Sequence, residues 1–394
     1  LYGGEGLRSM RFATARLLAG ISLGVIFLSV VGFLFPTATL WRANSFYAMG
    51  LAIAAMFLTR LAATQTAGAD AFRRRVLVLG AGPRAARLAK LANEPGSGLI
   101  MAGFVAMSPT EKKITGAVPR EAIASLSDHV VELRVGEVVL ALEERRGALP
   151  LTDLLRVKTT GVYVNDIASF IERETGRVDL ATTNPSGLIF SDGFSAGQRI
   201  SKVAKRLFDI VASLAVLVIG LPLIIVAAIA VKLDSKGPIF YRQSRVGLFG
   251  EPYRILKIRS MRADAEAAGQ AVWASENDPR ITRVGNIIRK LRIDELPQIW
   301  CVLKGDMSFV GPRPERPAFV EELEVALPYY AERHMVKPGL TGWAQINYPY
   351  GASVEDARVK LEYDLYYAKN YSPFLDLLIL LQTVRVVLWP EGAR

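Results

Sequence analysis

Two adjacent carboxylates, Asp294 and Glu295, are the residues of this chain best suited to chemistry. They directly precede Leu296-Pro297, and cationic side chains accompany them in the surrounding segments. These cations are Lys257, Arg259, Arg292 and Arg313. A carboxylate nucleophile is repelled by a phosphorylated substrate unless cations or a divalent metal neutralise the charge. The set therefore predicts phosphoryl chemistry, although an Asp-Glu pair is also typical of the first turn of a helix, where it would serve only as a cap.

An amphipathic helix is predicted immediately before the carboxylate pair. The apolar residues at 284, 287, 288 and 291 have the spacing i, i+3, i+4 and i+7, which places them on one helical face. This helix would deliver Asp294 and Glu295 at its end. Beyond the pair, Arg313 lies between Pro312 and Pro314. Because both prolines restrict the backbone, the planar guanidinium is presented with little loss of conformational freedom, which suits a phosphate group.

Cysteine and histidine are too scarce to build other kinds of site. The chain has one cysteine, Cys301, and two histidines, His129 and His334, which are far apart in the sequence. Zinc clusters and catalytic triads are therefore not expected. Mg²⁺ takes oxygen ligands and keeps some of its waters, so it is the expected cofactor of a site that has carboxylates and lacks a useful Cys or His.

The composition of the chain indicates a membrane protein. Hydrophobic residues make up 51% of the chain and the mean hydropathy is positive, which is unusual for a soluble protein. The formal net charge is +11. Lys and Arg serve nucleic acid, anionic lipid and phosphorylated substrates equally well, so the charge alone does not select among these partners.

Two transmembrane helices are predicted in residues 1–66. One apolar run covers 12–35 and another covers 46–58, and the first is long enough to cross a hydrocarbon core of about 30 Å. Arginines flank both outer ends, which indicates a hairpin with both of these ends in the cytoplasm. The chain begins with Leu1 rather than Met, so the sequence leaves open whether further helices precede it.

A third apolar segment, residues 205–233, is predicted to be a re-entrant membrane helix. Pro222 near its middle lacks a backbone donor and would bend the helix. Positive charges flank both ends of the segment, as expected on the cytoplasmic side, and a straight span, which remains the alternative, would carry one flank across the membrane. The apolar stretch 374–389 is interrupted by polar residues and predicts either an interfacial helix or a buried core helix.

Residues 72–168 predict a Rossmann-like parallel α/β domain. Short β-branched runs alternate with helical segments, beginning with the strand at 76–79. The following Gly80-x-Gly82-x-x-Ala85 is the pattern that lets a pyrophosphate approach a helix N-terminus. No acidic residue that could hold a ribose occurs in 103–108, at the end of the second strand, so the favoured interpretation is a structural or regulatory domain without NAD. Residues 169–200 are polar and turn-rich and predict a linker.

Six motifs in the second half of the chain carry a resemblance to a known family. They are Lys205-Arg206-x-x-Asp209, Gly237-Pro238-Ile239-Phe240-Tyr241-Arg242-Gln243-x-Arg245-Val246-Gly247, Lys257-x-Arg259-Ser260-Met261, Asp294-Glu295-Leu296-Pro297-Gln298, Gly311-Pro312-Arg313-Pro314-Glu315 and Lys337-Pro338-Gly339-Leu340-Thr341-Gly342-Trp343-Ala344-Gln345. With them, residues 201–394 resemble the catalytic domain of the bacterial sugar transferases, the monotopic polyprenyl-phosphate hexose-1-phosphate transferases. With the α/β region included, the resemblance extends to the exopolysaccharide-type members, which usually have four N-terminal helices rather than two.

The resemblance implies a two-step transfer of hexose-1-phosphate from a UDP-sugar to a polyprenyl phosphate, such as undecaprenyl phosphate, with release of UMP. Asp294 would form a covalent phosphosugar intermediate and Glu295 would complete the dyad, with Mg²⁺ bridging them to the pyrophosphate. Arg313 and Lys257 would bind phosphate oxygens, and Asp364 occupies a further position that the family uses. The resemblance also implies a bacterial inner-membrane protein with its catalytic domain on the cytoplasmic face, in contact with membrane lipid and not with nucleic acid.

The resulting expectation is an α/β membrane protein with N-terminal transmembrane helices, a Rossmann-like domain and a C-terminal monotopic catalytic domain. Two other functions remain open. One is an NAD-dependent sugar-nucleotide epimerase or reductase that uses the Gly80 loop, and the other is a non-enzymatic membrane scaffold that senses nucleotides. The sequence also leaves open which hexose is transferred and whether the protein forms a homo-oligomer.

Overall fold

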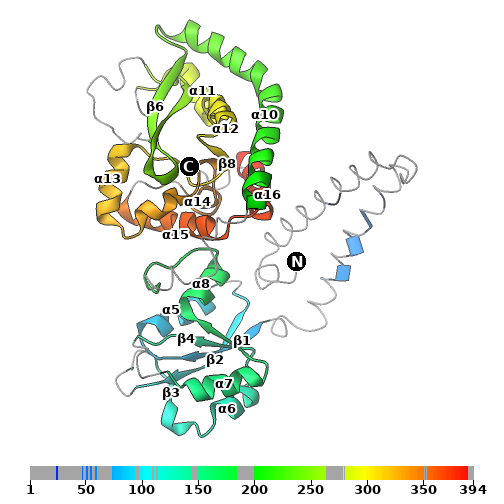
Figure 1. Cartoon of the computed structure of the whole chain (residues 1–394), viewed down its shortest axis with the longest axis vertical. Coiled ribbons are helices and arrows are strands. Elements are labelled where there is room, and N and C mark those ends of the chain that lie inside the picture. The colour runs from blue at the N-terminus through cyan, green and yellow to red at the C-terminus, as the bar shows by residue number, and fades with distance from the viewer. Residues whose placement is uncertain are drawn as a thin grey trace. The chain divides into compact units, whose positions relative to one another are not determined.

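A computed structural model describes the two compact units of the chain, Leu1–Asn184 and Pro185–Arg394 (Figure 1). The described residues are 73–94, 97–108, 111, 114–143, 149–183, 199–262, 278, 280–349, 351 and 353–388, together with isolated positions between Gly24 and Thr59. The two transmembrane helices predicted in residues 1–66 lie outside this described part, apart from those isolated positions.

The first unit is built on a parallel five-stranded sheet with the order β3-β2-β1-β4-β5. Its strands are β1 (Arg74–Leu79), β2 (Leu99–Ala106), β3 (Val118–Pro119), β4 (Glu137–Leu140) and β5 (Tyr163–Asp166). Its helices are α5 (Pro83–Ala92), η2 (Arg120–Ala122), α6 (Leu126–Glu132), α7 (Leu151–Thr159) and α8 (Ile167–Thr175). The predicted parallel sheet with alternating helices is thereby confirmed, and its strand order is 3-2-1-4-5, as in the first five strands of the doubly wound fold.

Helices cover both faces of this sheet (Figure 1). One apolar core joins Val76 and Val78 of β1 to α5 and α8, and a second joins Leu77 and Leu79 to α6 and α7. All four of these β1 side chains are fully buried. Because successive side chains of a strand point to opposite faces, a stretch of strand covered on both faces must be apolar, which explains the run at 76–79 that the sequence analysis interpreted as a strand.

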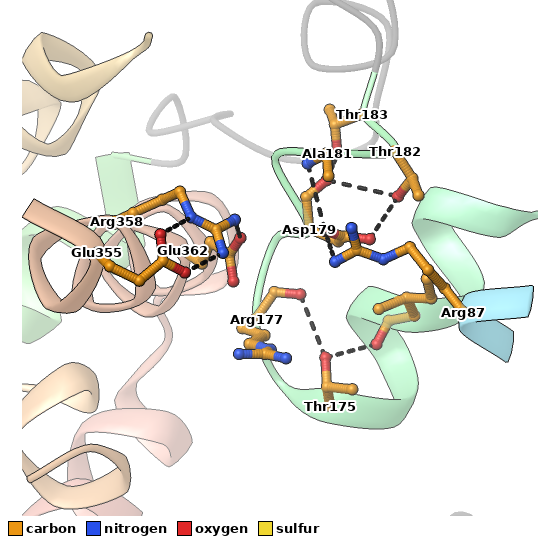
Figure 2. Close-up of polar contacts among 11 residues, drawn as sticks. Arg87, Thr175, Arg177, Asp179, Ala181, Thr182, Thr183, Glu355, Arg358 and Glu362 are labelled. Carbon is orange, nitrogen blue, oxygen red and sulfur yellow. Dashed lines mark hydrogen bonds and ion pairs between the residues drawn. The ribbon is translucent and has the colours of Figure 1, made fainter. Parts of the chain in front are cut away.

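The predicted linker, residues 169–200, includes residues that belong to the first unit. Residues 169–175 belong to α8, and Phe170 and Ile171 lie in the core of the first unit. The chain then turns through Asp179, whose carboxylate accepts a hydrogen bond from Arg87 of α5 at 2.9 Å and one from the Thr182 hydroxyl at 2.9 Å (Figure 2). The polar composition of residues 169–183 predicted a linker, but hydrogen bonds as well as apolar contacts hold this segment in the first unit.

The first described element of the second unit is one long helix, α10 (Arg199–Asp234), which continues through Pro222. Its strands are β6 (Phe240–Val246) and β7 (Pro252–Ile258), which pair antiparallel, and β8 (Ser308–Val310) and β9 (Gly339–Thr341), which pair in parallel. The remaining elements are η3 (Leu248–Gly250), α11 (Arg283–Lys290), η4 (Ile293–Gln298), α12 (Ile299–Lys304), α13 (Pro317–Ala326), η5 (Tyr330–Met335), α14 (Trp343–Asn347), α15 (Val354–Asn370) and α16 (Pro373–Leu388).

Among the described residues, α10 is the one helix long and apolar enough to cross a membrane. Only 17% of its most apolar 18-residue stretch is buried, and Figure 1 shows the helix as a curved ribbon along one side of the second unit. Near its start, Arg206 donates to the carbonyls of Val302 and Leu303 at 2.7 and 2.6 Å. Near its end, Ala227 and Val231 pack in an apolar cluster with residues of β7 and α11. Both ends of α10 therefore contact the same folded body.

Helix α16 is a core helix over the part whose side chains are described. Leu378 and Ile379 are buried, and the buried Asp376 pairs with Lys205 of α10 at 2.6 Å. The Tyr367 hydroxyl donates to the same carboxylate at 2.7 Å. Of the two interpretations of 374–389, the buried helix therefore describes this part of the stretch.

Helix α15 begins with a capping box that should be measurable in stability. The Ser353 hydroxyl accepts from the Asp356 backbone N–H at 3.1 Å, and the Asp356 carboxylate accepts from the Ser353 N–H at 3.0 Å. We expect Ser353→Ala to lower the free energy of unfolding by about 1 kcal/mol, because one helix N–H loses its acceptor. Thermal unfolding in detergent measures the change, and Ser353→Thr, which keeps the hydroxyl, is the control that should remain near wild type.

Candidate active site

The two carboxylates singled out in the sequence lie in η4, directly after α11. Arg292 joins the two elements in the left-handed backbone region, with a φ of 57°, so the chain turns sharply before Asp294. The amphipathic helix predicted over 284–291 is present, but only part of its apolar face is covered. Ile288 is buried, whereas Ile287 and Leu291 are exposed.

Glu295 is surrounded by cations. Its Oε1 accepts from Arg313 at 2.8 Å and from Lys257 at 3.0 Å, and its Oε2 lies 3.8 Å from Arg292. Burial alone would raise the pKa of this carboxyl, but the three cations together hold it well below its ordinary value. Glu295 is therefore ionised and acts as the common anchor of three basic side chains that come from β7, the α11–η4 turn and the segment after β8.

Asp294, the neighbouring carboxylate, has a different environment. Its residue is 8% exposed, and it forms no hydrogen bond or ion pair with any other residue that the structure describes. Burial and the adjacent Glu295 charge raise its pKa, against the opposing effect of Lys257 and two arginines. The two adjacent carboxylates can therefore have separate roles. Glu295 is bound by cations, whereas Asp294 keeps both oxygens available to bind a ligand or to act as a nucleophile.

The cluster lies beside the middle of α10. Gly220 is buried there, and a Cβ placed on it would come within 3.6 Å of the Leu296 side chain of η4. The turn that carries Asp294 is therefore packed against the apolar helix. Trp300 of α12 is exposed near the same turn, together with Ile287 and Leu291.

Arg259 lies outside this cluster, although the sequence analysis grouped it with Lys257. Strand β7 ends at Ile258, so the alternation that points Lys257 toward Glu295 does not continue to residue 259. The Arg259 guanidinium instead donates to the carbonyls of Ser235 and Lys236, both at 2.7 Å, just after the end of α10. Its observed role is to bind the backbone carbonyls of the turn that follows α10.

Asp364 also lies outside the carboxylate cluster. It is 2% exposed and pairs with Arg333 at 2.7 Å. Arg333 in turn donates to the backbone carbonyl of Arg313 at 3.0 Å. The sequence analysis did not select Arg333, since the one available signal was a lone arginine in a short helical turn, which is usually solvated.

The glycine loop of the first unit is occupied by carboxylates of the same chain. Gly80 has a φ of 125°, and a Cβ there would lie 2.6 Å from the carbonyl oxygen of Ala141, so glycine is required. Glu143 lies over Gly82 and accepts from the Arg84 N–H at the start of α5 at 3.1 Å. A second carboxylate, that of Glu111, accepts from the backbone N–H groups of Ala81 and Met107 at 3.4 and 3.2 Å.

We expect this loop not to bind a dinucleotide. A pyrophosphate at the N-terminus of α5 would have to displace Glu143 and would be repelled by two carboxylates. Titration of the whole protein with NADH, followed by its fluorescence, should show no saturable binding below about 1 mM. Saturable binding that Gly82→Val abolishes would instead favour the epimerase or reductase alternative.

An apolar helix against a mixed α/β body and a carboxylate pair among cations define a membrane-associated protein with a site suited to phosphorylated ligands. Residues 200–390 match the model of a family described as bacterial sugar transferase. The chain belongs to this bacterial sugar transferase family, as curated relatives also indicate. A UDP-N-acetylgalactosamine-undecaprenyl-phosphate N-acetylgalactosaminephosphotransferase of Aeromonas hydrophila is 43% identical over 241 residues, which are 61% of this chain and 56% of the relative.

Two further relatives are similar over different shares of the chain. A UDP-glucose:undecaprenyl-phosphate glucose-1-phosphate transferase of Caulobacter vibrioides is 42% identical over 191 residues, 48% of this chain and 71% of the relative. A protein with the same name in Klebsiella pneumoniae is 34% identical over 293 residues, 72% of this chain and 62% of the relative. Three curated relatives are much longer than the aligned part, and the chain spans only about half or less of their length.

Proposed function

We propose that this protein transfers hexose-1-phosphate from a UDP-sugar to undecaprenyl phosphate and releases UMP, which starts the assembly of an exopolysaccharide. The observation that carries the proposal is the contrast between the two carboxylates. Glu295 is bound to three cations, whereas Asp294 beside it has no hydrogen bond or ion pair with another described residue. Membership of the bacterial sugar transferase family and the names of the relatives support the same activity.

In the proposed first step, an Asp294 carboxylate oxygen attacks the sugar-bearing phosphorus of the UDP-sugar. A phosphorus–oxygen bond to the aspartate forms, the bond to the bridging oxygen breaks, and UMP leaves with the electron pair. In the second step an oxygen of undecaprenyl phosphate attacks the same phosphorus, and the bond to Asp294 breaks. Attack on the acyl phosphate by an oxyanion needs cations close to both phosphates, and Lys257, Arg292 and Arg313 are the basic side chains at this site.

Mg²⁺ fits the donor set that the structure offers. The described residues contain no group of three or more metal-ligating side chains, so they would not enclose a metal by protein ligands alone. Mg²⁺, however, is usually bound by one or two carboxylates together with water and substrate phosphates. Asp294 and Glu295 would hold the ion, which would neutralise charge on the pyrophosphate. Asp294 has its oxygens available for this, and Glu295 has them shared with cations.

We further propose that α10 is re-entrant and holds the active site at the cytoplasmic surface of the bacterial inner membrane. Its two ends contact one body, which argues against a straight span that would separate them. Apolar side chains are exposed along its whole length: Val203, Leu207, Val211, Leu214, Val218, Ile219, Leu221, Leu223, Ile225, Val226, Ile229 and Leu233. Basic residues at both ends favour the cytoplasmic side. The helices predicted in 1–66 would add a second attachment.

The activity is tested with the whole protein purified in detergent. It is incubated with Mg²⁺, undecaprenyl phosphate and radiolabelled UDP-glucose or UDP-N-acetylgalactosamine, the donors in the names of the relatives. The expected result is label in the lipid fraction and an equal amount of UMP. Absence of both products with every UDP-hexose tried would refute the proposed activity.

The re-entrant arrangement is tested by labelling single introduced cysteines. Cys301 is buried, so it contributes little background. Lys202→Cys and Lys236→Cys place a thiol in an exposed position at either end of α10. In inverted inner-membrane vesicles, an impermeant maleimide should label both positions. Labelling of only one of the two would instead identify a straight span.

A further inference from the structure

The segment that carries Arg313 is held by its carbonyl groups. Pro312 and Pro314 supply no backbone N–H, so carbonyls do most of the hydrogen bonding of this segment. Each of the four carbonyls from 312 to 315 accepts a hydrogen bond from another part of the unit. The donors, in order, are the Gly339 N–H at 2.9 Å, Arg333 at 3.0 Å, Arg245 at 3.0 Å and the Val246 N–H at 3.0 Å.

The two arginine donors are themselves fixed. Arg333 is 5% exposed and binds Asp364 through Nε and Nη2 at 3.1 and 2.7 Å, while its Nη1 donates to the Tyr330 hydroxyl at 2.7 Å. Arg245 lies 3.7 Å from the Glu315 carboxylate and donates to Gln243 at 2.6 Å. A planar guanidinium that bonds two partners at once has one orientation, which a flexible lysine cannot reproduce.

Close backbone packing fixes the same segment from another direction. A Cβ on Gly311 would lie 2.2 Å from the Lys337 carbonyl oxygen, and a Cβ on Gly339 would lie 2.1 Å from the Gly311 nitrogen. Only glycine permits this approach, which brings Gly311, directly after β8, against Gly339 at the start of β9. The backbone of Arg313 therefore has little freedom to move, while its side chain remains about one-third exposed and contacts Glu295.

We propose that Arg333 and Arg245 are positioning residues that hold the Arg313 backbone so that its guanidinium meets the substrate phosphate, and that Asp364 acts through Arg333 rather than on the substrate. This proposal rests on the proposed function, in which Arg313 binds phosphate oxygens. Asp364 is 2% exposed, and its observed ion pair with Arg333 leads back to the carbonyl of Arg313. In this proposal neither Arg333 nor Arg245 contacts the reacting atoms. Each holds the backbone of Arg313, whose guanidinium does.

The first test replaces each positioning arginine with lysine, which keeps the charge and loses the fork. In the whole protein, Arg333→Lys and Arg245→Lys should each lower kcat/KM for UMP release by about 10- to 100-fold, because small displacements of a positioned group are costly to catalysis. Asp364→Asn should behave like Arg333→Lys. The matched control is Arg358→Lys, on the same helix as Asp364, whose ion pairs with Glu355 and Glu362 are unrelated to Arg313 (Figure 2). It should remain within about threefold of wild type.

A double-mutant cycle separates positioning from general destabilisation. In an Arg313→Ala background, Arg333→Lys should cost less than about threefold, since the group that it positions is already absent. A loss of the same size in both backgrounds would overturn the proposal, and so would a wild-type rate for Arg333→Lys. If Arg333→Lys does not fold, the same cycle is run with Arg245→Lys, and thermal unfolding identifies that case.

Binding of UDP, measured by calorimetry, makes the test independent of turnover. Wild type should bind UDP through Arg313, and Arg333→Lys should weaken binding by a factor that disappears in the Arg313→Ala background. If UDP binds in this way and no UDP-sugar yields UMP, the proposed function fails and the positioning role stands. If UMP is released and the cycle is additive, the positioning role alone fails. UDP binding that does not depend on Arg313 also overturns it.

Discussion

Replacement of Asp294 by asparagine is expected to lower hexose-1-phosphate transfer by at least about 10⁴-fold, the scale of loss seen when a nucleophile is removed. The amide has nearly the same shape but cannot form the bond to phosphorus. The folded protein should be at least as stable as wild type, because burial and Glu295 raise the pKa of this carboxyl and so disfavour its charge. UMP release measures the rate, and thermal unfolding measures the stability.

The proposed covalent intermediate on Asp294 can be detected directly. Wild-type protein incubated with a UDP-sugar and no lipid acceptor should gain the mass of one hexose phosphate on the peptide that contains Asp294, and Asp294→Asn should gain none. Asp306→Asn, at a partly exposed aspartate that forms an ion pair with Lys304, serves as the matched control and should label normally. A phosphosugar found on another side chain, or an active Asp294→Asn protein, would contradict the assignment.

Replacement of Glu295 by glutamine should lower transfer by about 10²- to 10³-fold, a loss comparable to removing one electrostatic group from a catalytic site. Glutamine is nearly isosteric but cannot neutralise the cations that share Glu295. Arg313 and Lys257 both bond its Oε1, so without the charge they repel each other and leave their positions. Steady-state UMP release measures the effect, and KM for the UDP-sugar should rise as kcat falls.

The pH profile of the same variant has a defined direction. Burial lowers the pKa of Lys257, and the Glu295 charge raises it again. Removing that charge therefore lowers the pKa further, so the protonated lysine is lost at a lower pH than in wild type. The alkaline limb of the kcat/KM profile should move to lower pH in Glu295→Gln. Glu251→Gln, at an exposed turn, should leave the profile unchanged, and an unshifted limb in Glu295→Gln would argue that Lys257 does not contribute as a cation.

For the carboxylate pair, residue types and spacing predicted the position of the site but not the difference between its two members. Asp294 and Glu295 follow an amphipathic helix whose period is plain in the sequence, and that helix ends just before them in the structure. The sequence gives no reason for the two to differ, since both are acidic and adjacent. Their difference comes from three cations supplied by distant segments, and all three converge on Glu295.

The cation set shows where local spacing misleads. Lys257 and Arg259 are two residues apart and would share one face of a strand, but β7 ends between them. Lys257 therefore reaches Glu295, whereas Arg259 closes the end of α10. In the opposite sense, Arg333 was not selected from the sequence, because its hydrogen bond to the Arg313 carbonyl, twenty residues earlier in the chain, is formed only on folding.

Local chemistry was sufficient for whatever depends on neighbours along the chain. The apolar run of α10, the apolar residues 76–79 of β1, the glycine pattern after them and the prolines around Arg313 were all readable from the sequence, because sterics and burial act there over a few residues. Long-range folding alone decided which cations meet Glu295, that both ends of α10 rest on one body, and that Glu143 covers the glycine loop. Those outcomes depend on contacts between segments far apart in the chain, and no periodicity within one segment encodes which distant carbonyl or carboxylate its side chains will meet.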